Sequence, residues 1–209
     1  WGAFDGATGT SLWYSSFVGD ATRIIDKPSG TNGLIIDDRL ILLIPKRGLV
    51  ALDRHTGQQL WERILEVHHY WATPILAGEE IVTGGDHGVL AVLRVDNGAV
   101  QHQWKLPEGE YPTGLASKGD RLFVAMPNGT VCAIRLEDGE LLWSFATGKA
   151  LVDMVPTRRG GSSVLAPPFP WMDWLLVPGS DGILHILDPA TGSVAQQIDF
   201  GAPLTATPC

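Results

Sequence analysis

Short runs of alternating hydrophobic and polar residues recur along the chain, and turn-forming residues separate them. The runs "WATPILAG", "EEIVTGG", "DHGVLAVLRVDNG" and "AVQHQWKL" follow one another over residues 71–106, and residues 112–148 repeat this order. Each run is too short for an amphipathic helix, and Gly, Asp and Asn at the breaks are typical of tight turns. The pattern therefore predicts units of four antiparallel β-strands.

A turn glycine marks the register of each unit. The five segments that end at this glycine read "AFDGATG", "ALDRHTG", "VLRVDNG", "AIRLEDG" and "ILDPATG", and their glycines are 48, 41, 41 and 53 residues apart. A unit of about 41 residues has the length of a four-stranded propeller blade. The longer spacings reflect extra residues around "RIIDKPSGTNG" and "PTRRGGSSVLAPPFPW", and such insertions usually lie in loops.

The two most complete copies, residues 3–13 and 51–61, share the pattern Ala-x-Asp-x-x-Thr-Gly-x-x-x-Trp. We expect Gly57 to adopt the left-handed backbone of the turn between the third and fourth strands, with Asp53 accepting hydrogen bonds from the turn amides. Trp61 is expected to bury its ring against the neighbouring sheet. The residues assigned to this structural repeat are Asp5, Gly9, Trp13, Asp53, Gly57, Trp61, Gly139, Trp143, Asp188 and Gly192.

This pattern resembles the tryptophan-docking repeat of the quinoprotein, or pyrroloquinoline-quinone-like (PQQ-like), β-propellers. In that family the tryptophan packs between adjacent blades. The other copies match in part: the fourth has Arg135 in place of Asp, the last has Gln196 in place of Trp, and the third has Arg94 and His102 at these positions. The resemblance implies an all-β propeller of four-stranded antiparallel blades.

The register then predicts one partial propeller domain. Residues 1–17 are assigned to the end of a blade, residues 18–63, 64–106, 107–146 and 147–200 to four blades, and residues 201–209 to the first strand of a next blade. An open propeller leaves sheet edges unpaired, so we expect another chain or further sequence to complete the ring. The alternatives are a dimer joined at its edges and an incomplete further blade formed by the two ends.

The net charge and the sequence motifs disfavour several classes of function. The net charge is −8, from 15 Lys and Arg against 23 Asp and Glu, which disfavours a surface that binds nucleic-acid phosphates. No run of the sequence approaches the roughly 18 hydrophobic residues that a membrane span needs. The resemblance implies that a dehydrogenase of this family would carry an adjacent Cys-Cys pair, calcium ligands and a catalytic Asp. The sequence has no Cys-Cys pair, and no acidic residue can be assigned to the metal or base position from spacing.

The favoured function is therefore a non-catalytic quinoprotein-like scaffold that binds a protein or a ligand, with no cofactor. Its partner would be another protein, the remaining blades of a larger propeller, or a small ligand at the channel mouth. One alternative is a fragment of a PQQ-dependent alcohol or sugar dehydrogenase, which would need PQQ and calcium. Another is a sensor propeller attached to a signalling or synthetase domain. The resemblance favours an extracytoplasmic location.

The first candidate contact site is "HHYWATP", residues 68–74. By register this segment enters an innermost strand, close to the mouth of the central channel, and His68, His69, Tyr70 and Trp71 offer imidazole groups and aromatic rings. Adjacent histidines in a strand point to opposite faces, so no metal site is predicted. We expect either contact with a ligand or peptide, or ordinary loop packing.

The second candidate is "PFPWMDW", residues 168–174, which the register places in the longer insertion. Trp171 and Trp174 with Phe169 could form an exposed anchor patch, because aromatic residues are enriched where protein interfaces gain most of their binding energy. The alternative is structural: Trp174 begins a buried strand, and Phe169 covers the top of the blade.

Overall fold

The computed structural model describes residues 2–15, 33–44, 48–65, 72–106, 110–152 and 164–207. These residues form four four-stranded antiparallel sheets, one two-stranded sheet and a single 3-10 turn at Asp86–Gly88. The predicted all-β fold is confirmed. No helix among the described residues is long and apolar enough to cross a membrane.

Within each sheet, every strand pairs with the next strand in the sequence. The two-stranded sheet contains β1 (Gly2–Phe4) and β2 (Ser11–Tyr14). The four-stranded sheets contain β3 (Leu34–Ile36), β4 (Arg39–Ile44), β5 (Gly48–Asp53) and β6 (Gln59–Arg63); β7 (Ile75–Ala77), β8 (Glu80–Gly84), β9 (Val89–Arg94) and β10 (Val100–Lys105); β11 (Gly114–Lys118), β12 (Arg121–Ala125), β13 (Thr130–Arg135) and β14 (Leu141–Ala146); and β15 (Phe169–Trp171), β16 (Trp174–Pro178), β17 (Ile183–Leu187) and β18 (Val194–Asp199). Such meanders are the expected product of short runs joined by tight turns.

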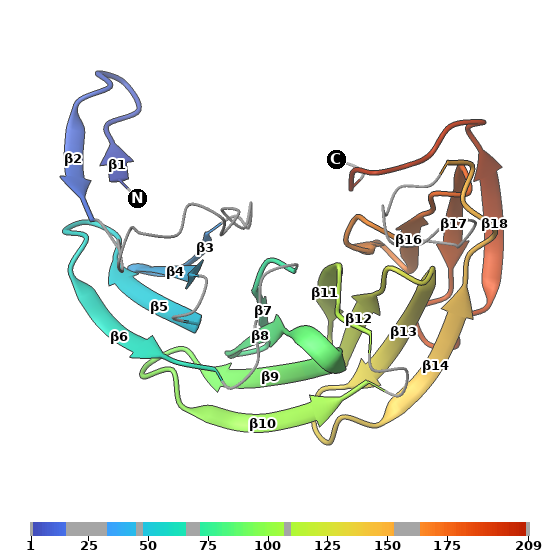
Figure 1. Cartoon of the computed structure of the whole chain (residues 1–209), viewed down its shortest axis with the longest axis horizontal. Coiled ribbons are helices and arrows are strands. Elements are labelled where there is room, and N and C mark those ends of the chain that lie inside the picture. Colours follow the sequence, from blue (N-terminus) through green and yellow to red (C-terminus); the bar gives the residue numbers. More distant parts are fainter. Residues whose placement is uncertain are drawn as a thin grey trace.

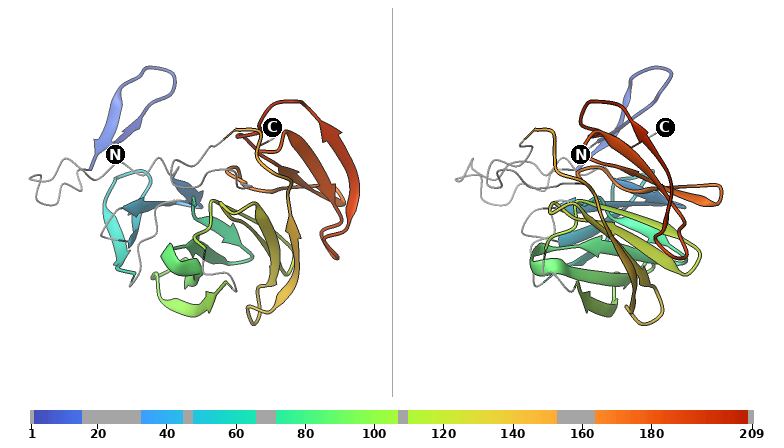
Figure 2. Two further views of the ribbon diagram at one scale, coloured as in Figure 1. Left: turned by 45° about the vertical axis from the view of Figure 1, so that its right-hand side comes forward. Right: turned by 90° about the vertical axis from the view of Figure 1, so that its right-hand side faces the viewer.

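The sheets stand side by side around an arc, as the blades of a propeller do (Figure 1). The first strands of successive sheets contact one another, β3 with β7, β7 with β11 and β11 with β15, so these strands lie toward the centre. The fourth strands β6, β10, β14 and β18 lie on the outside of the arc (Figure 1). The hairpin β1–β2 and the last sheet lie at opposite ends of the arc, also in the left view of Figure 2.

The hydrophobic core lies between the sheets. Each middle strand buries residues on both faces, so β5, β9 and β13 consist of nearly continuous hydrophobic runs. One cluster joins Leu49 and Trp61 of the first four-stranded sheet to Ile81 and Leu93 of the second, and similar clusters join the second sheet to the third and the third to the fourth. Neighbouring blades therefore stabilise one another by burying apolar area.

Residues 201–207 form no strand. The chain instead turns back along the last sheet, where the Phe200 amide donates to the Gly182 carbonyl at 2.9 Å and the Leu204 amide to the Gly179 carbonyl at 3.1 Å. The assignment of this segment to a next blade remains a prediction.

Candidate functional site

The turn that follows each third strand is the most regular feature of the molecule. In the turn after β5, one oxygen of the Asp53 carboxylate accepts hydrogen bonds from the amides of His55 and Thr56, at 2.9 and 2.8 Å, and from the Thr56 hydroxyl at 3.0 Å. Donation from the Thr56 amide lowers the pKa of the Asp53 carboxyl below its usual value. Gly57 completes the turn with φ of 71°, a conformation that costs little only for glycine.

This turn forms a seat for a tryptophan of the preceding sheet. The indole of Trp13 lies on Gly57, so closely that a Cβ at that position would be 2.5 Å from the Trp13 ring. The indole N–H donates to the carbonyl of Arg54 at 2.8 Å. We call this combination, the turn glycine that receives the ring and the carbonyl of the second turn residue, a tryptophan seat.

The seat recurs at later junctions between blades. Trp61 lies on Gly98, where a Cβ would be 2.6 Å from the ring, and donates to the Val95 carbonyl at 3.0 Å. Trp143 lies in the same way on Gly192. Both tryptophans are only 9% exposed. Trp13, Trp61 and Trp143 thus lie at the contacts between neighbouring sheets, on Gly57, Gly98 and Gly192.

One docking residue does not follow the sequence spacing. At the junction onto Gly139 the ring comes from Trp104, two residues beyond the position that the repeat assigns to the tryptophan. His102 takes that position and pairs with Val92. The rings of His102 and Trp104 stack, with their centroids 5.9 Å apart. Residues i and i+2 of a strand share a face, so the presence of Trp104 on the correct face was a usable signal.

In two turns an arginine replaces the aspartate at the first turn position, and an ion pair between this arginine and a later aspartate of the turn closes it. Arg94 donates to Asp96 at 2.9 Å, and Arg135 donates to Asp138 at 2.8 Å. The side-chain hydrogen bond from Arg94 lowers the pKa of Asp96. In the last blade the first turn position is again an aspartate, and Asp188 accepts a hydrogen bond from the Ala190 amide at 2.6 Å.

The predicted insertion "PFPWMDW" is largely a β-hairpin. Phe169 begins β15, Trp171 ends it and Trp174 begins β16, with Trp171 and Trp174 paired across the turn. Trp174 therefore begins a strand, but its own side chain is 39% exposed, Trp171 is 48% exposed and Met172 is 70% exposed. We call Trp171, Met172 and Trp174 the aromatic tip.

Met172 occupies a backbone position that other blades give to different residues. The turns between first and second strands carry Asp37, Gly78 and Gly119 at positive φ, and Met172 has φ of 49°. A residue with a large side chain is uncommon in this conformation. The Lys118 ammonium group donates to the Met172 carbonyl and so attaches the tip to the neighbouring blade. The fold does not require an exposed methionine here.

The first candidate site lies outside the described residues. His68, His69, Tyr70 and Trp71 fall in the segment 66–71, which the structure does not describe. Their assignment to the channel mouth stays a prediction.

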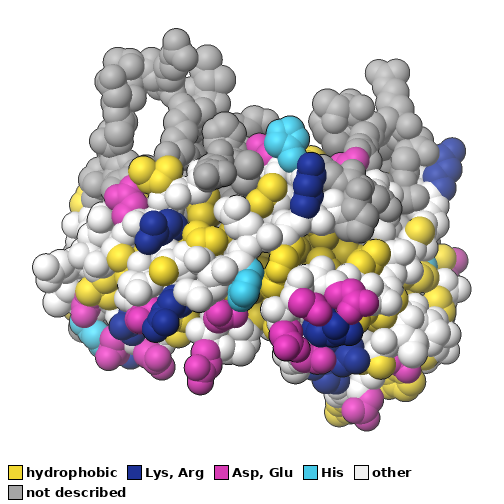
Figure 3. Space-filling model, turned by 90° about the horizontal axis from the view of Figure 1, so that it is seen from below, with side chains coloured by type: hydrophobic (Ala, Val, Ile, Leu, Met, Phe, Trp, Pro, Cys, Tyr) yellow, Lys and Arg dark blue, Asp and Glu magenta, His cyan; other side chains and the backbone are white. Residues whose placement is uncertain are grey.

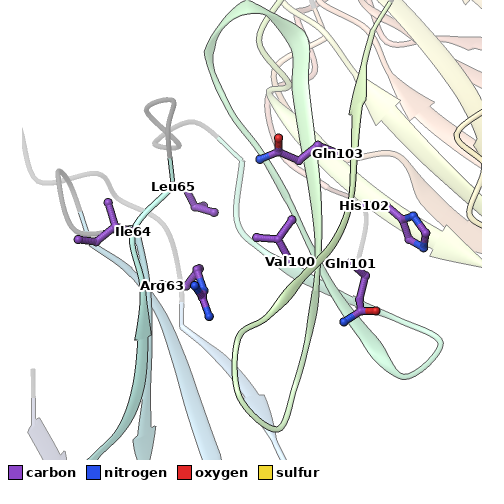
Figure 4. Close-up of a pocket in the computed structure, with 7 residues that line it drawn as sticks. All are labelled: Arg63, Ile64, Leu65, Val100, Gln101, His102 and Gln103. Atoms are coloured by element: carbon purple, nitrogen blue, oxygen red, sulfur yellow. The ribbon is translucent and has the colours of Figure 1, made fainter.

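An open groove separates the outer strands of two blades. It has a volume of about 390 Å³. Leu65, Val100 and Gln103 point into the space between β6 and β10, while Ile64 points away from it (Figure 4). The Arg63 guanidinium donates a hydrogen bond from Nε to the Gly98 carbonyl at 2.7 Å, so this N–H is not available to a ligand. The residues that line the groove are Arg63, Ile64, Leu65, Val100, Gln101, His102 and Gln103.

A buried polar cluster joins the third and fourth four-stranded sheets. Asp181 and His185 have side chains only 4% and 2% exposed, and they approach to 2.9 Å. The same carboxylate accepts from the amide of Gly148, which follows β14, at 2.7 Å and from the Ile183 amide at 3.1 Å. The Gln197 amide group lies 3.0 Å from the other ring nitrogen of His185. Because its buried polar groups are bonded, the cluster can serve as a structural link between blades.

The surface carries both signs of charge side by side (Figure 3). Arg54 lies 3.5 Å from Asp38, and Arg121 lies 2.9 Å from Asp120. Within the described ranges no group of three or more His, Cys, Asp or Glu could hold a metal ion.

Two comparisons concern sequence. The family model of the outer membrane protein assembly factor BamB matches residues 2–117 and 46–208. The outer membrane protein assembly factor BamB of Taylorella asinigenitalis (strain MCE3) is 24% identical over 189 residues, which cover 86% of this chain and 46% of the relative. That of Legionella pneumophila (strain Paris) is 23% identical over 193 residues, with the same coverage. The chain spans about half the length of these relatives.

Solved structures show the same fold. BamB from Moraxella catarrhalis superposes with a TM-score of 0.63 at 20% identity, over 82% of this chain and 48% of the other. The quinohemoprotein alcohol dehydrogenase from Comamonas testosteroni superposes with a TM-score of 0.68 at 12% identity, over 97% of this chain and 42% of the other. At these identities the similarity shows the propeller fold alone.

Proposed function

Since the chain belongs to the family of the outer membrane protein assembly factor BamB, we propose that it is a non-catalytic propeller scaffold that binds a protein partner. Its relatives are named as assembly factors for outer membrane proteins, so the proposal includes a role in that assembly and a location outside the cytoplasm. Scaffolding of this kind needs a stable set of blades and an exposed contact surface. The tryptophan seats stabilise the set of blades, and the aromatic tip is our candidate for the contact surface.

The observation that carries the proposal is the exposed apolar turn at Met172. Trp171 and Met172 are 48% and 70% exposed, on a turn whose counterparts elsewhere carry acidic residues or glycine. Exposed hydrophobic residues that lie together mark contact sites, and aromatic side chains are enriched among the residues that contribute most to such contacts. The bond from Lys118 to the Met172 carbonyl holds the tip in place, which reduces the entropy lost on binding.

A photo-cross-linking experiment tests this function. A benzophenone side chain would replace Met172 in the full chain, expressed in a bacterium that assembles outer membrane proteins. We expect one discrete protein adduct that weakens when Trp171→Ser is added. The matched control carries the benzophenone at Glu79, an exposed residue in the corresponding turn of another blade.

Two results would overturn the proposal. Equal labelling from positions 79 and 172 would show that the tip has no preferred partner. Reduction of a dye by the purified chain, given PQQ, calcium and an alcohol or sugar, would instead support the dehydrogenase alternative.

A further inference from the structure

The turn within the aromatic tip contains an acidic residue that has no counter-charge. Asp173 is exposed and follows Met172 in the turn that joins Trp171 to Trp174. Within the described ranges, no hydrogen bond or ion pair reaches its carboxylate. The turn therefore presents an unpaired negative charge next to two exposed tryptophans.

The same turn in the first four-stranded sheet holds its acidic residue in an ion pair. There Asp38 takes the place of Asp173, and its carboxylate lies 3.1 Å from the His55 ring and 3.5 Å from the Arg54 guanidinium. Both partners belong to the neighbouring turn after β5. In the last sheet the corresponding residues, 189–190, are Pro and Ala, so this turn supplies no cation.

The third four-stranded sheet uses a different arginine at the same turn. Asp120 pairs with Arg121, the first residue of β12, at 2.9 Å. Trp174 begins β16 and so holds the place of Arg121 in the last sheet. Both positions that supply a cation to this turn in other sheets are therefore uncharged in the last one.

Lys118 contacts the tip without neutralising this charge. Its ammonium group donates to the Met172 carbonyl, and among the residues that the structure describes no ion pair joins it to Asp173. The chain as a whole has a net charge of −8, so its overall field also favours the approach of a cationic group.

Two indole rings and a carboxylate are groups that together recognise a guanidinium. A cation is attracted to the negative face of an indole ring, and the planar guanidinium can stack on that face while its N–H groups donate to a carboxylate. Trp171 and Trp174 are cross-strand partners, so their side chains lie on the same face of the hairpin. A lysine would supply the charge without the planar group that stacks.

We propose that the aromatic tip binds an arginine side chain of its protein partner, which stacks on the tryptophans and donates to the Asp173 carboxylate. The bound arginine takes the part that Arg54 and Arg121 have at the same turn of other sheets. The partner is accordingly a protein that exposes an arginine on its contact surface. This inference rests on the proposed function, because it specifies the chemistry of the partner bound at the same tip.

A peptide with a single arginine, acetyl-Gly-Gly-Arg-Gly-Gly-amide, is the probe. Its twin carries citrulline, which keeps the planar shape but has no charge. Each peptide is titrated into the full chain while NMR follows the indole N–H resonances of Trp171 and Trp174. We expect the arginine peptide to shift these resonances and to bind at least about threefold more tightly than its twin. Asp173→Asn should weaken binding of the arginine peptide by about threefold.

The matched control is Glu79→Gln. Glu79 is an exposed acidic residue at the same place of the turn in the second four-stranded sheet, where Ala77 and Glu80 take the places of the two tryptophans. This variant loses the same charge and should bind the arginine peptide as the original chain does. Equal affinity for the two peptides, or an equal loss in Asp173→Asn and Glu79→Gln, would overturn the proposal.

Cross-linking from benzophenone at position 172 separates this inference from the proposed function. Loss of the adduct with Asp173→Asn, but not with Glu79→Gln, would support the arginine contact. An adduct that forms equally well with Asp173→Asn would overturn that contact, while the proposed function would stand. If no preferred adduct forms in the original chain, the proposed function fails, and the inference fails with it.

Discussion

The strands β14 and β18 hold the same place in successive blades, yet one is an interface and the other is exposed along its whole length. In β14, Trp143 is 9% exposed and rests on Gly192 of the next blade. In β18, Gln196 has the same pairing register and is exposed. Both strands are fully paired within their own sheets, so strand pairing alone does not build the contact between blades. At the β14 junction the contact combines the Trp143 ring on Gly192 with the hydrophobic cluster that joins the third and fourth four-stranded sheets.

The largest effect should come from removing the ring at an occupied junction. Trp143→Ala deletes a buried side chain and its bond to Pro189, and should lower the free energy of unfolding by about 3 to 5 kcal/mol. Gln196→Ala, in the same register of β18, should change it by less than about 0.5 kcal/mol. Urea unfolding of both variants makes the comparison. Similar losses would mean that β18 is also covered in solution.

The buried carboxylate at the same junction should come next. Asp181→Ala leaves His185 and the amides of Gly148 and Ile183 without their shared acceptor, so we expect a loss of about 3 kcal/mol. Asp199→Ala is the matched control, because Asp199 is exposed and accepts from the nearby Gly201 amide. A loss no larger than that of the control would show that the buried cluster does not link the blades.

A pair of glycine substitutions separates two costs of placing a side chain on a turn glycine: the strain of the left-handed backbone and the steric clash with the tryptophan ring. Gly98→Ala and Gly9→Ala both place a Cβ on a left-handed residue, at φ of 65° and 70°, and each should lose about 1 kcal/mol for that reason. At Gly98 the Cβ also meets the Trp61 ring at 2.6 Å, which should add about 2 kcal/mol. The difference in unfolding free energy between the two variants measures this contact. Equal losses would contradict close packing of Trp61.

Acid should weaken the turns that use a carboxylate. The pKa values of Asp5 and Asp53 are lowered by hydrogen bonds, led by those from the Thr8 and Thr56 amides, so both contribute stability above the ordinary value of 3.8. That contribution is lost as the pH falls through the lowered pKa. We expect Asp53→Asn to reduce the drop in melting temperature between neutral and strongly acidic solution. Asp5→Asn should reduce it less, because the N-terminal turn supports no described blade contact. An unchanged drop in Asp53→Asn would exclude this role.

The sequence predicted the blades well because their signals are local. A left-handed glycine such as Gly57 and an aspartate that closes its turn can be recognised from spacing within one segment. Trp104 was missed because strict spacing points to His102, although strand geometry puts both residues on one face. The repeat could not indicate the Asp181 cluster, since its partner Gly148 lies 33 residues earlier, in the segment that follows β14.

The sequence determines the geometry of the candidate site less directly, for a related physical reason. The aromatic residues of "PFPWMDW" are visible in the sequence, but their place in an insertion rests only on the longer spacing between Gly139 and Gly192. The pairing of Trp171 with Trp174 and the positive φ of Met172 are set by the hairpin. Exposure of these side chains depends on neighbouring blades, which no single segment encodes.

The smallest effect on stability should follow from substitution in the aromatic tip. Trp171→Ala removes a ring that is 48% exposed and has no seat beneath it, so the loss should stay below about 1 kcal/mol in urea unfolding. The same substitution should reduce the cross-linking from position 172, whereas Gln196→Ala should not. A loss as large as that of Trp143→Ala would place Trp171 in the core between blades. The tip would then be part of the architecture, and the contact surface would have to be sought elsewhere.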